Sequence, residues 1–395
     1  MTPLNPSAGG KSCAGCGPYK PGTGHLDIQI ESKITAQKHL MIGGFSIRMK
    51  RRRFLQAASV GGAVGLAGCA GWVFDSDKTP SNLVSPQSAL QWRVKSEVPW
   101  PSAPAAADDA FFIGGSAIQA LDPDSGDELW RAAGEGTPAV WDGTVYVTGL
   151  GRVIALDAES GDEQWTYTLG DPSRVPESPV AVTEDAVYAA NGALHAIDRS
   201  TGDKLWKNES VSGVLGASES IVCIDAGGGF LYGIDPASGE ELWNRIGTWD
   251  RPVASDEAVY VADGEVVLKL DARSGDIQWT SETDTDGLAN TVSNQALYVS
   301  SSHDGVYRLD TESGDASRVL SVESHVSPPS VQGETVFVGA DSRLYGFPRD
   351  GDQWTVDIEP REKLAIGPVS PASVTRDIVC VNFRNWTYGL DPSSY

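Results

Sequence analysis

The sequence is poor in the two residue types, cysteine and histidine, that most often hold metals. Only Cys223 and Cys380 follow Cys69 among the five cysteines, and the pair Cys13 and Cys16 has no second cysteine pair to complete a zinc site. In the repeats described below, the histidines are His195, His303 and His325, in different repeats or loops. We therefore expect no metal centre and no catalytic histidine cluster.

Basic residues are scarce as well. The chain has 30 basic and 53 acidic residues, a net charge of −23. Nine of the basic and two of the acidic residues precede Cys69, so the rest carries 21 against 51, or −30, with only six lysines. A charge of this sign excludes nucleic acid as the expected partner. It indicates a protein of a halophile, because molar salt reduces the Debye length to about 3 Å and screens the repulsion, and the alternative is an ordinary acidic extracellular domain.

No apolar run is long enough to span a bilayer. The longest, Phe54 to Gly68, has a basic head before it and small residues after it, which is the pattern of an export signal. Arg51, Arg52, Phe54 and Leu55 resemble the twin-arginine pattern, which routes folded proteins, although Lys50 stands where that pattern usually has Ser or Thr. The run ends in a lipobox-like Leu-Ala-Gly-Cys, so we expect Cys69 to be lipid-modified.

The domain organisation follows from this signal. An export signal acts from the start of a chain, so we expect translation to begin at Met49 and residues 1–48 to be a spurious or disordered extension. Residues 49–69 are then the signal, 70–87 a linker and 88–395 the folded domain. We expect the mature protein to be anchored, through the lipid on Cys69, to the outer face of the cytoplasmic membrane.

A ten-residue segment recurs about every 37 residues in the folded domain. It reads LDPDSGDELW at Leu121 to Trp130 and returns in four further copies that end at Trp165, Trp206, Trp243 and Trp279. The Asp caps a turn, the Gly takes the positive φ that a short loop needs, and the Trp lies on the next strand. Together with three short runs rich in Val, Tyr, Ala and Ile, each repeat predicts four strands.

Eight repeats can be counted in two ways that are offset from each other. The corner aspartates are Asp122, Asp157, Asp198, Asp235, Asp271, Asp310 and Asp391, with a degenerate Phe347-Pro348 between the last two. The strand tryptophans are Trp92, Trp130, Trp165, Trp206, Trp243, Trp279 and Trp354, with Arg318 in the seventh place. The first Trp strand has no corner before it and the last corner has no Trp strand after it.

The offset predicts a closed ring. We expect an all-β, eight-bladed propeller of four-stranded antiparallel blades, in which the N-terminal strand completes the C-terminal blade and Ser394 lies near Ser88. The tryptophans are expected to dock each blade on the next, burying some 200 Å² each, an upper estimate of roughly 4 to 5 kcal/mol. Cys223 and Cys380 fall on opposite blades, so we predict small buried side chains and no disulfide.

The repeat Ala155 to Trp165, ALDAESGDEQW, resembles that of the pyrroloquinoline-quinone-type propellers over about residues 88–394. The resemblance implies this propeller fold. It admits quinone-dependent dehydrogenases and also non-catalytic lipoproteins that scaffold outer-membrane protein assembly. A dehydrogenase of this family needs Ca²⁺ held by carboxylate and amide oxygens and an Asp base, often with a disulfide of adjacent cysteines, which this chain lacks.

The expected inner strands are built from small, weakly polar residues, as in Thr137 to Val140 and Ser370 to Val374, with Glu219, Arg251 and Asp256 as the only candidates for a small-ligand site. Repeats of 35 to 43 residues leave no insertion for a lid. We therefore expect a non-enzymatic scaffold for an unknown surface protein or extracellular ligand, with no cofactor and no catalytic residue. The alternatives are a dehydrogenase that uses pyrroloquinoline quinone and Ca²⁺ at a divergent site, and an extracellular sugar-binding module.

Overall fold

A computed structural model describes residues 83–84, 89–96, 102–107, 109–170, 179–247, 252–263, 266–283, 287–288, 292, 296–301, 304–322, 326–332, 335–340, 343–348, 354–357 and 369–391. The chain divides into two units, residues 1–70 and 71–395, and every described residue belongs to the second. Among the described residues, no helix is long and apolar enough to cross a membrane.

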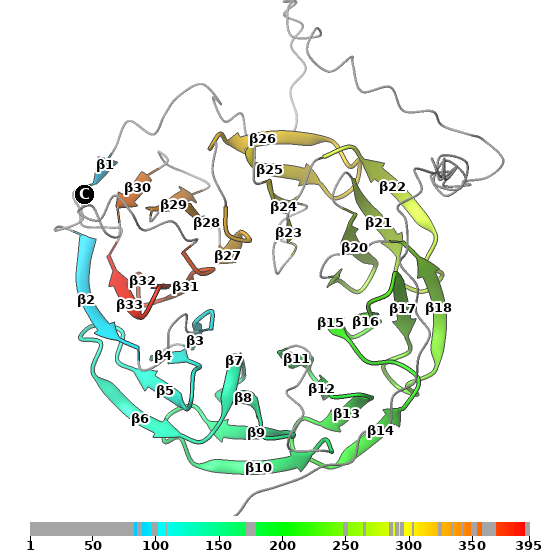
Figure 1. Ribbon diagram of the computed structural model, residues 1–395, viewed down its shortest axis with the longest axis horizontal. Coiled ribbons are helices and arrows are strands. Elements are labelled where there is room, and N and C mark those ends of the chain that lie inside the picture. The colour runs from blue at the N-terminus through cyan, green and yellow to red at the C-terminus, as the bar shows by residue number, and fades with distance from the viewer. Residues whose placement is uncertain are drawn as a thin grey trace, which may run out of the picture. The chain divides into compact units, whose positions relative to one another are not determined.

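The second unit is a ring of eight antiparallel blades (Figure 1). Blade one consists of β3 (Ala105–Ala107), β4 (Ala110–Ile113), β5 (Ile118–Leu121) and β6 (Glu128–Ala132). Blade two consists of β7 (Glu135–Trp141), β8 (Thr144–Gly149), β9 (Arg152–Asp157) and β10 (Glu163–Thr168). Blade three consists of β11 (Ala181–Val182), β12 (Ala186–Ala190), β13 (Leu194–Asp198) and β14 (Lys204–Asn208). Blade four consists of β15 (Val214–Ala217), β16 (Val222–Asp225), β17 (Phe230–Ile234) and β18 (Glu241–Ile246).

The remaining blades repeat this order from the inside of the ring to its rim. Blade five consists of β19 (Val253–Ala254), β20 (Ala258–Ala262), β21 (Val267–Asp271) and β22 (Ile277–Ser281). Blade six consists of β23 (Gly287–Leu288), β24 (Ala296–Ser301), β25 (Gly305–Asp310) and β26 (Ala316–Leu320). Blade seven consists of β27 (Ser330–Gln332), β28 (Thr335–Ala340), β29 (Arg343–Pro348) and β30 (Trp354–Asp357). Blade eight consists of β31 (Ser373–Thr375), β32 (Ile378–Phe383), β33 (Trp386–Leu390) and β2 (Leu90–Lys95).

Blade eight closes the ring as the offset of the repeats predicts. The N-terminal strand β2 pairs antiparallel with β33, with Leu90 opposite Leu390 and Lys95 opposite Trp386. Figure 1 shows the blue strand β2 along the red strand β33 at the rim. The pairing joins the two ends of the repeat array, so no blade is left with a missing strand. Ser88 and Ser394 themselves lie outside the described residues.

The structure adds one strand that the sequence analysis did not predict. Leu83 and Val84, assigned above to the linker, form β1 (Leu83–Val84), which pairs parallel with β30 as a fifth strand of that sheet. Such a two-residue strand has no periodicity of its own, and only the open edge of blade seven makes it a strand. In blade six, the inner strand β23 has only two residues, Gly287–Leu288.

The middle strands of the blades hold the core. Every residue of β8, β12, β20, β24 and β32 is buried, because neighbouring blades cover both faces of each sheet. This burial explains why these strands read as continuous apolar runs, whereas the outer strands alternate between a buried and an exposed side.

The corner turns have the capping that the repeat predicts. In blade two, Asp157 Oδ1 accepts hydrogen bonds from the amides of Glu159 (3.1 Å) and Ser160 (2.8 Å) and from the Ser160 hydroxyl (3.0 Å). Gly161 follows with a φ of 76°. These bonds, the Ser160 amide foremost, hold the pKa of Asp157 below its usual value, because they favour the carboxylate.

Candidate functional site: the seams between blades and the inner wall

Six tryptophans connect each outer strand to the corner turn of the following blade. In every case the indole Nε1 donates a hydrogen bond to the carbonyl of the residue directly after the corner Asp. The pairs are Trp92 to Pro123 (2.7 Å), Trp130 to Ala158 (3.0 Å), Trp165 to Arg199 (3.0 Å), Trp206 to Pro236 (2.8 Å), Trp243 to Ala272 (2.9 Å) and Trp279 to Thr311 (3.0 Å). The side chain of Trp354 lies outside the described residues, so its docking remains a prediction.

The corner glycine lies directly under each of these rings. A Cβ atom on Gly126 would come within 2.6 Å of Trp92 Cδ2, and the corner glycines of the next five blades meet the preceding Trp in the same way. Glycine is therefore required at this position for two reasons: the backbone has a positive φ, and the indole ring leaves no room for a Cβ atom. The turn and the tryptophan of the repeat form one seam unit although they belong to different blades.

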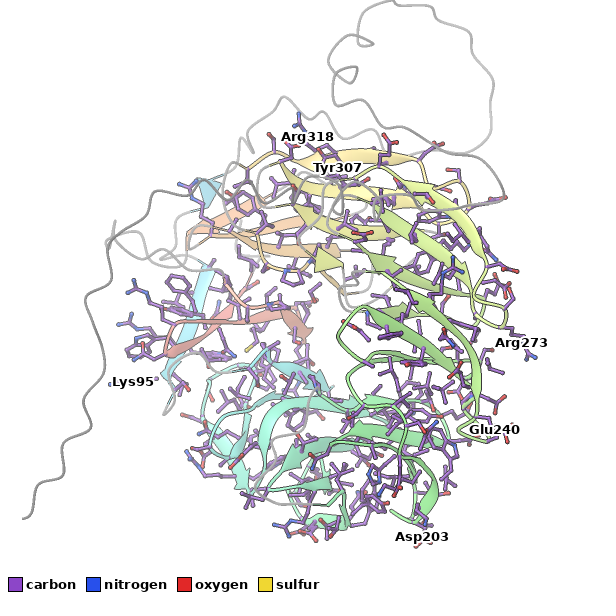
Figure 2. The ribbon with its side chains drawn as sticks, turned by 45° about the vertical axis from the view of Figure 1, so that its right-hand side comes forward. Lys95, Asp203, Glu240, Arg273, Tyr307 and Arg318 are labelled. Carbon is purple, nitrogen blue, oxygen red and sulfur yellow. The ribbon has the colours of Figure 1, made fainter. Side chains whose placement is uncertain are left out.

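The seam between blades six and seven has no such unit. Arg318 stands in the Trp position, and its Nη1 lies 3.9 Å from Asp304 Oδ1 of its own blade. Tyr307, which is opposite Arg318 in the strand pair, donates its hydroxyl to the same carboxylate (3.2 Å; Figure 2). Buried Val319 and Leu320 pack there with Val336 and Val338 of blade seven. Aliphatic packing thus replaces the tryptophan where the next corner is degenerate.

A second regularity runs across each blade in line with the Trp. In blades one, two, three, five and seven the row contains an aromatic residue on the second strand, for example Tyr146 opposite Ala155, which is opposite Trp165. In blades four and eight the row is Cys, Gly and Trp: Cys223, Gly233 and Trp243, then Cys380, Gly389 and Trp92. The two cysteines therefore occupy equivalent positions in opposite blades.

Both thiols are free and buried, as the sequence analysis expects of small core side chains. Cys223 Sγ lies 3.3 Å from the carbonyl oxygen of Gly216, and burial raises the pKa of the Cys223 thiol to about 12. Burial also raises the pKa of Cys380. Neither thiol has the thiolate character that a reactive cysteine needs.

His195 is buried in β13 at the interface of blades two and three. Its Nδ1 lies 3.1 Å from the Tyr167 hydroxyl, and its Nε2 has no partner, nor does Nδ2 of the buried Asn191 in the adjoining turn. Burial, and secondarily the charge of Lys207, lowers the pKa of His195 to about 4, so the ring is neutral near pH 7. His303 and His325 lie outside the described residues.

The inner wall uses its polar side chains to connect neighbouring blades. Ser330 Oγ donates to the Ala372 carbonyl (2.6 Å), and Ser373 Oγ donates to the Pro104 carbonyl (2.7 Å). Ser102 Oγ lies 3.2 Å from the Gly136 carbonyl, and the Asn382 amide donates to the Ser102 carbonyl. These bonds span the seams from blade seven through blades eight and one to blade two. The small hydroxyl residues of the wall are structural donors.

Two of the three charged candidates of the wall, Glu219 and Asp256, lie within the described residues. Glu219 accepts the Glu184 amide of blade three (2.6 Å), and Arg199 donates to the Glu184 carbonyl from the same side. Asp256 is exposed at the turn between β19 and β20, and Arg251 lies outside the described residues. Glu219 is thereby a seam contact between blades three and four.

A quinone and Ca²⁺ site of the dehydrogenase type does not fit the described residues. Such a site needs several carboxylate and amide oxygens that converge on one ion. Among the residues that the structure describes, no three His, Cys, Asp or Glu side chains are grouped to hold a metal ion. Glu219, one of the carboxylate candidates of the wall, is bonded to a backbone amide.

The closing seam has one feature that the sequence analysis missed. Arg376, in the turn between β31 and β32, forms an ion pair with Asp109 of blade one, and its Nη1 lies 3.4 Å from Asp124 Oδ2. These carboxylates raise the pKa of the Arg376 guanidinium. The two partners lie more than 250 positions earlier in the sequence, so no local pattern signals the contact.

The sequence of the domain belongs to the family of the outer membrane protein assembly factor BamB, whose profile matches residues 82–220, 114–248 and 227–394. No curated protein matches the chain at a significant level. The export and lipidation residues Arg51, Arg52, Phe54, Leu55 and Cys69 lie outside the described residues, so their roles remain predictions.

Solved structures share the fold. BamB from Moraxella catarrhalis is 16% identical with a TM-score of 0.55, over 76% of this chain and 99% of that one. The computationally designed protein Ika8 is 15% identical with a TM-score of 0.62, over 76% and 99%. A europium-containing methanol dehydrogenase is 13% identical with a TM-score of 0.53, over 77% and 86%. At these identities the similarity concerns the propeller architecture, which occurs in an assembly factor and in an enzyme.

Proposed function

We propose that this protein is a surface-anchored, non-enzymatic propeller that acts as a protein-interaction or ligand-binding scaffold outside the cytoplasmic membrane. The observation that carries the proposal is the inner wall, where Ser330, Ser373 and Asn382 are bonded from blade to blade. Side chains that hold the ring together are not available to a substrate. Membership of the BamB family supports the same direction, since that family is named for an assembly factor.

The place of action follows from the sequence. The signal at 49–69 routes the folded chain out of the cell, and the lipid on Cys69 retains it at the membrane. There the propeller presents its loop faces to a partner protein or an extracellular ligand, and salt screens the acidic charge of its surface.

The anchor is tested by the variant Cys69→Ser, expressed in a halophilic archaeal host and followed by fractionation at molar salt. We expect the wild-type protein in the membrane fraction and the variant in the medium. Cys223→Ser is the matched control, because it also removes one cysteine but from the propeller, where the hydroxyl can take the place of the thiol beside the Gly216 carbonyl, and it should stay with the membrane. Retention of Cys69→Ser would contradict the lipid anchor.

The non-enzymatic character is tested separately by titrating pyrroloquinoline quinone and Ca²⁺ into the protein at molar salt. Tryptophan fluorescence reports binding, since the six docking tryptophans lie at the seams between blades. Dye reduction with simple alcohols and sugars reports turnover. We expect neither saturable binding nor turnover. Saturable binding with turnover that is lost on chelation identifies a dehydrogenase, whereas binding of a sugar alone identifies a glycan-binding module.

A further inference from the structure

Among the described residues, blade eight is the one blade with a net positive charge. Its basic residues outnumber its acidic residues by four to two: Arg93, Lys95, Arg376 and Arg384 against Asp377 and Asp391. Blade seven is neutral, with Arg343 and Asp357, and the other six blades are each negative. Glu97, which lies outside the described residues, leaves the balance of blade eight positive. Arg376 pairs with blade one across the closing seam, so the other three basic residues account for the remaining positive charge.

These three basic residues lie beside aromatic rings at the outer end of blade eight. Arg93 and Lys95 are exposed and lie on one face of the outer strand β2, because they are two residues apart. Arg93 Cζ lies 4.8 Å from the centre of the Trp386 ring, and Lys95 is opposite Trp386 in the β2–β33 pair. Arg384, in the turn before β33, lies over the ring of Phe383 at 5.7 Å. Figure 2 shows Lys95 at the outer rim of the ring. We refer to Arg93, Lys95, Arg384 and Trp386 as the blade-eight cationic edge.

The corresponding cations of other blades are neutralised within their own blade. The position directly after the docking Trp holds Arg93 in blade eight, Arg131 in blade one and Lys207 in blade three. Arg131 forms an ion pair with Glu128 (2.9 Å), and Lys207 forms one with the glutamate two residues further on (3.0 Å). Within the described part of the chain, no carboxylate pairs with Arg93 or Lys95. These two charges are therefore available to an anionic partner.

The cationic edge lies on the side of the ring that the chain from the lipid anchor reaches. Trp386 packs on the core cluster that joins blade eight to blade seven, which includes Leu344, and Arg93 lies over the same Trp386 ring. Strand β1 pairs on the outer edge of that neighbouring blade seven, and Figure 1 shows β1 and β2 next to each other on the outside of the ring. The 13 residues between Cys69 and Leu83 span at most about 50 Å when fully extended. A lipid on Cys69 thus keeps the rim of blades seven and eight near the bilayer.

The chemistry of this edge fits the phosphate groups of a lipid surface. At molar salt the Debye length is about 3 Å, so the acidic charge elsewhere on the ring repels little and only cations in direct contact attract. A guanidinium held over an aromatic ring presents a fork of N–H donors that binds two phosphate oxygens at once. Tryptophan favours the headgroup region of a bilayer, into which Arg and Lys side chains extend their charges. An acidic peptide would use the same cations but gives no role to the partly exposed Trp386 ring.

We propose that the blade-eight cationic edge docks on the phosphate headgroups of an anionic lipid bilayer and turns the rim of blades seven and eight toward the membrane. The docking rests on the proposed function in one respect, since the lipid on Cys69 supplies the high local concentration that a contact of three cations needs. The edge then sets which side of the ring meets the bilayer. Because the rim makes this contact, both loop faces of the propeller stay accessible to a partner.

Co-sedimentation of the full chain carrying Cys69→Ser with lipid vesicles in molar NaCl tests the docking without the lipid anchor. Its failure therefore leaves the anchor, which fractionation tests, untouched. We expect binding to phosphatidylglycerol vesicles and none to phosphatidylcholine vesicles, whose choline balances the phosphate. Arg93→Gln with Lys95→Gln should weaken binding by about fivefold, less than two basic residues contribute at physiological salt because molar salt screens part of the attraction. Arg131→Gln with Lys207→Gln is the matched control, because it removes the same two charges from ion-paired positions of the rim, and should bind as before.

A further variant and a competitor complete the test. Lys95→Gln alone should weaken binding about twofold at an unchanged unfolding temperature, because Lys95 is exposed and outside any ion pair among the described residues. Polyglutamate, at a carboxylate concentration equal to that of the lipid phosphate, should not release the protein from the vesicles. Equal binding to both kinds of vesicle overturns the proposal, and so does equal weakening by the two double variants. Release by polyglutamate also overturns it and identifies an acidic peptide as the partner of this edge.

Discussion

Trp243 lies flat against the Cα atom of Gly233, so closely that a Cβ on the glycine would lie less than 3.0 Å from the indole. The same relationship joins Trp92 and Gly389 in blade eight. In both blades the second-strand residue of the row is cysteine, where five other blades have Tyr or Phe. Trp243 and Trp92 are each 7% exposed. A small Cys and a Gly thus let the docking ring settle onto its own sheet.

Replacing Gly233 with Ala is therefore expected to destabilise the ring by about 2 to 3 kcal/mol, the cost of overpacking a rigid core. Gly149→Ala is the control, because Gly149 also lies in a strand without positive φ and its added Cβ meets its nearest neighbour at 3.2 Å. Urea unfolding at molar salt measures the two free energies. An equal effect of both substitutions would contradict the close Trp243 contact.

Acid is expected to destabilise the protein first through His195. The pKa of His195 in the fold is lowered to about 4 from 6.5, so the stability that its neutral form contributes is fully present above pH 6.5 and is lost as the pH falls toward 4. The shift corresponds to at most about 3 kcal/mol. His195→Ile places there the residue type that Ile154 supplies in blade two, and should flatten the unfolding temperature between pH 6.5 and 4. An unchanged pH dependence in this variant would show that His195 is not the titrating group.

The corner aspartates titrate in a lower window. The pKa values of Asp122, Asp157, Asp198, Asp235, Asp271 and Asp310 are all lowered, chiefly by hydrogen bonds from the turn's own serine or threonine residues. Their contribution is present above 3.8, the ordinary pKa of an Asp carboxyl, and is lost as the pH falls through the lowered pKa values. Asp157→Asn should reduce the slope of stability against pH below 4, whereas Asp162→Asn, whose carboxylate does not cap the corner, should not. Equal slopes for the two variants would refute the capping role.

Low salt is expected to unfold the protein. The charge of −30 after Cys69 repels itself once the Debye length grows beyond about 10 Å below 0.1 M salt. Some of the exposed acids lie at the rim, as Asp203 and Glu240 do in Figure 2. Thermal unfolding should be followed in NaCl from molar concentration downward, with sucrose at low salt as the control for an effect of solute alone. A constant unfolding temperature across the series, or full rescue by sucrose, would refute the halophilic interpretation.

Most of the architecture was predictable from the sequence because its cause is local and repeated. The corner from Asp157 to Gly161 contains its own capping oxygen and its own positive-φ residue, and the same turn recurs in successive repeats. The offset between corners and tryptophans then predicts that β2 completes blade eight, which the pairing of Leu90 with Leu390 confirms.

The details of the candidate site were harder to predict from the sequence. Glu219 looked available for a ligand in the sequence, but the Glu184 amide of another blade occupies it. Leu83 and Val84 were assigned to the linker, but they form β1 because β30 offers an edge. Each of these depends on a partner that is distant in the chain and follows no period.

The sequence by itself determined the number of blades, the closure of the ring and the seam unit of Trp and Gly, because turn chemistry and a repeated aromatic residue act within one or two adjacent repeats. Only the tertiary structure decided which polar groups of the wall are bonded across seams and why Cys223 stands in line with Gly233 and Trp243. These depend on distances between chain segments that no repeat encodes, and packing between blades sets them.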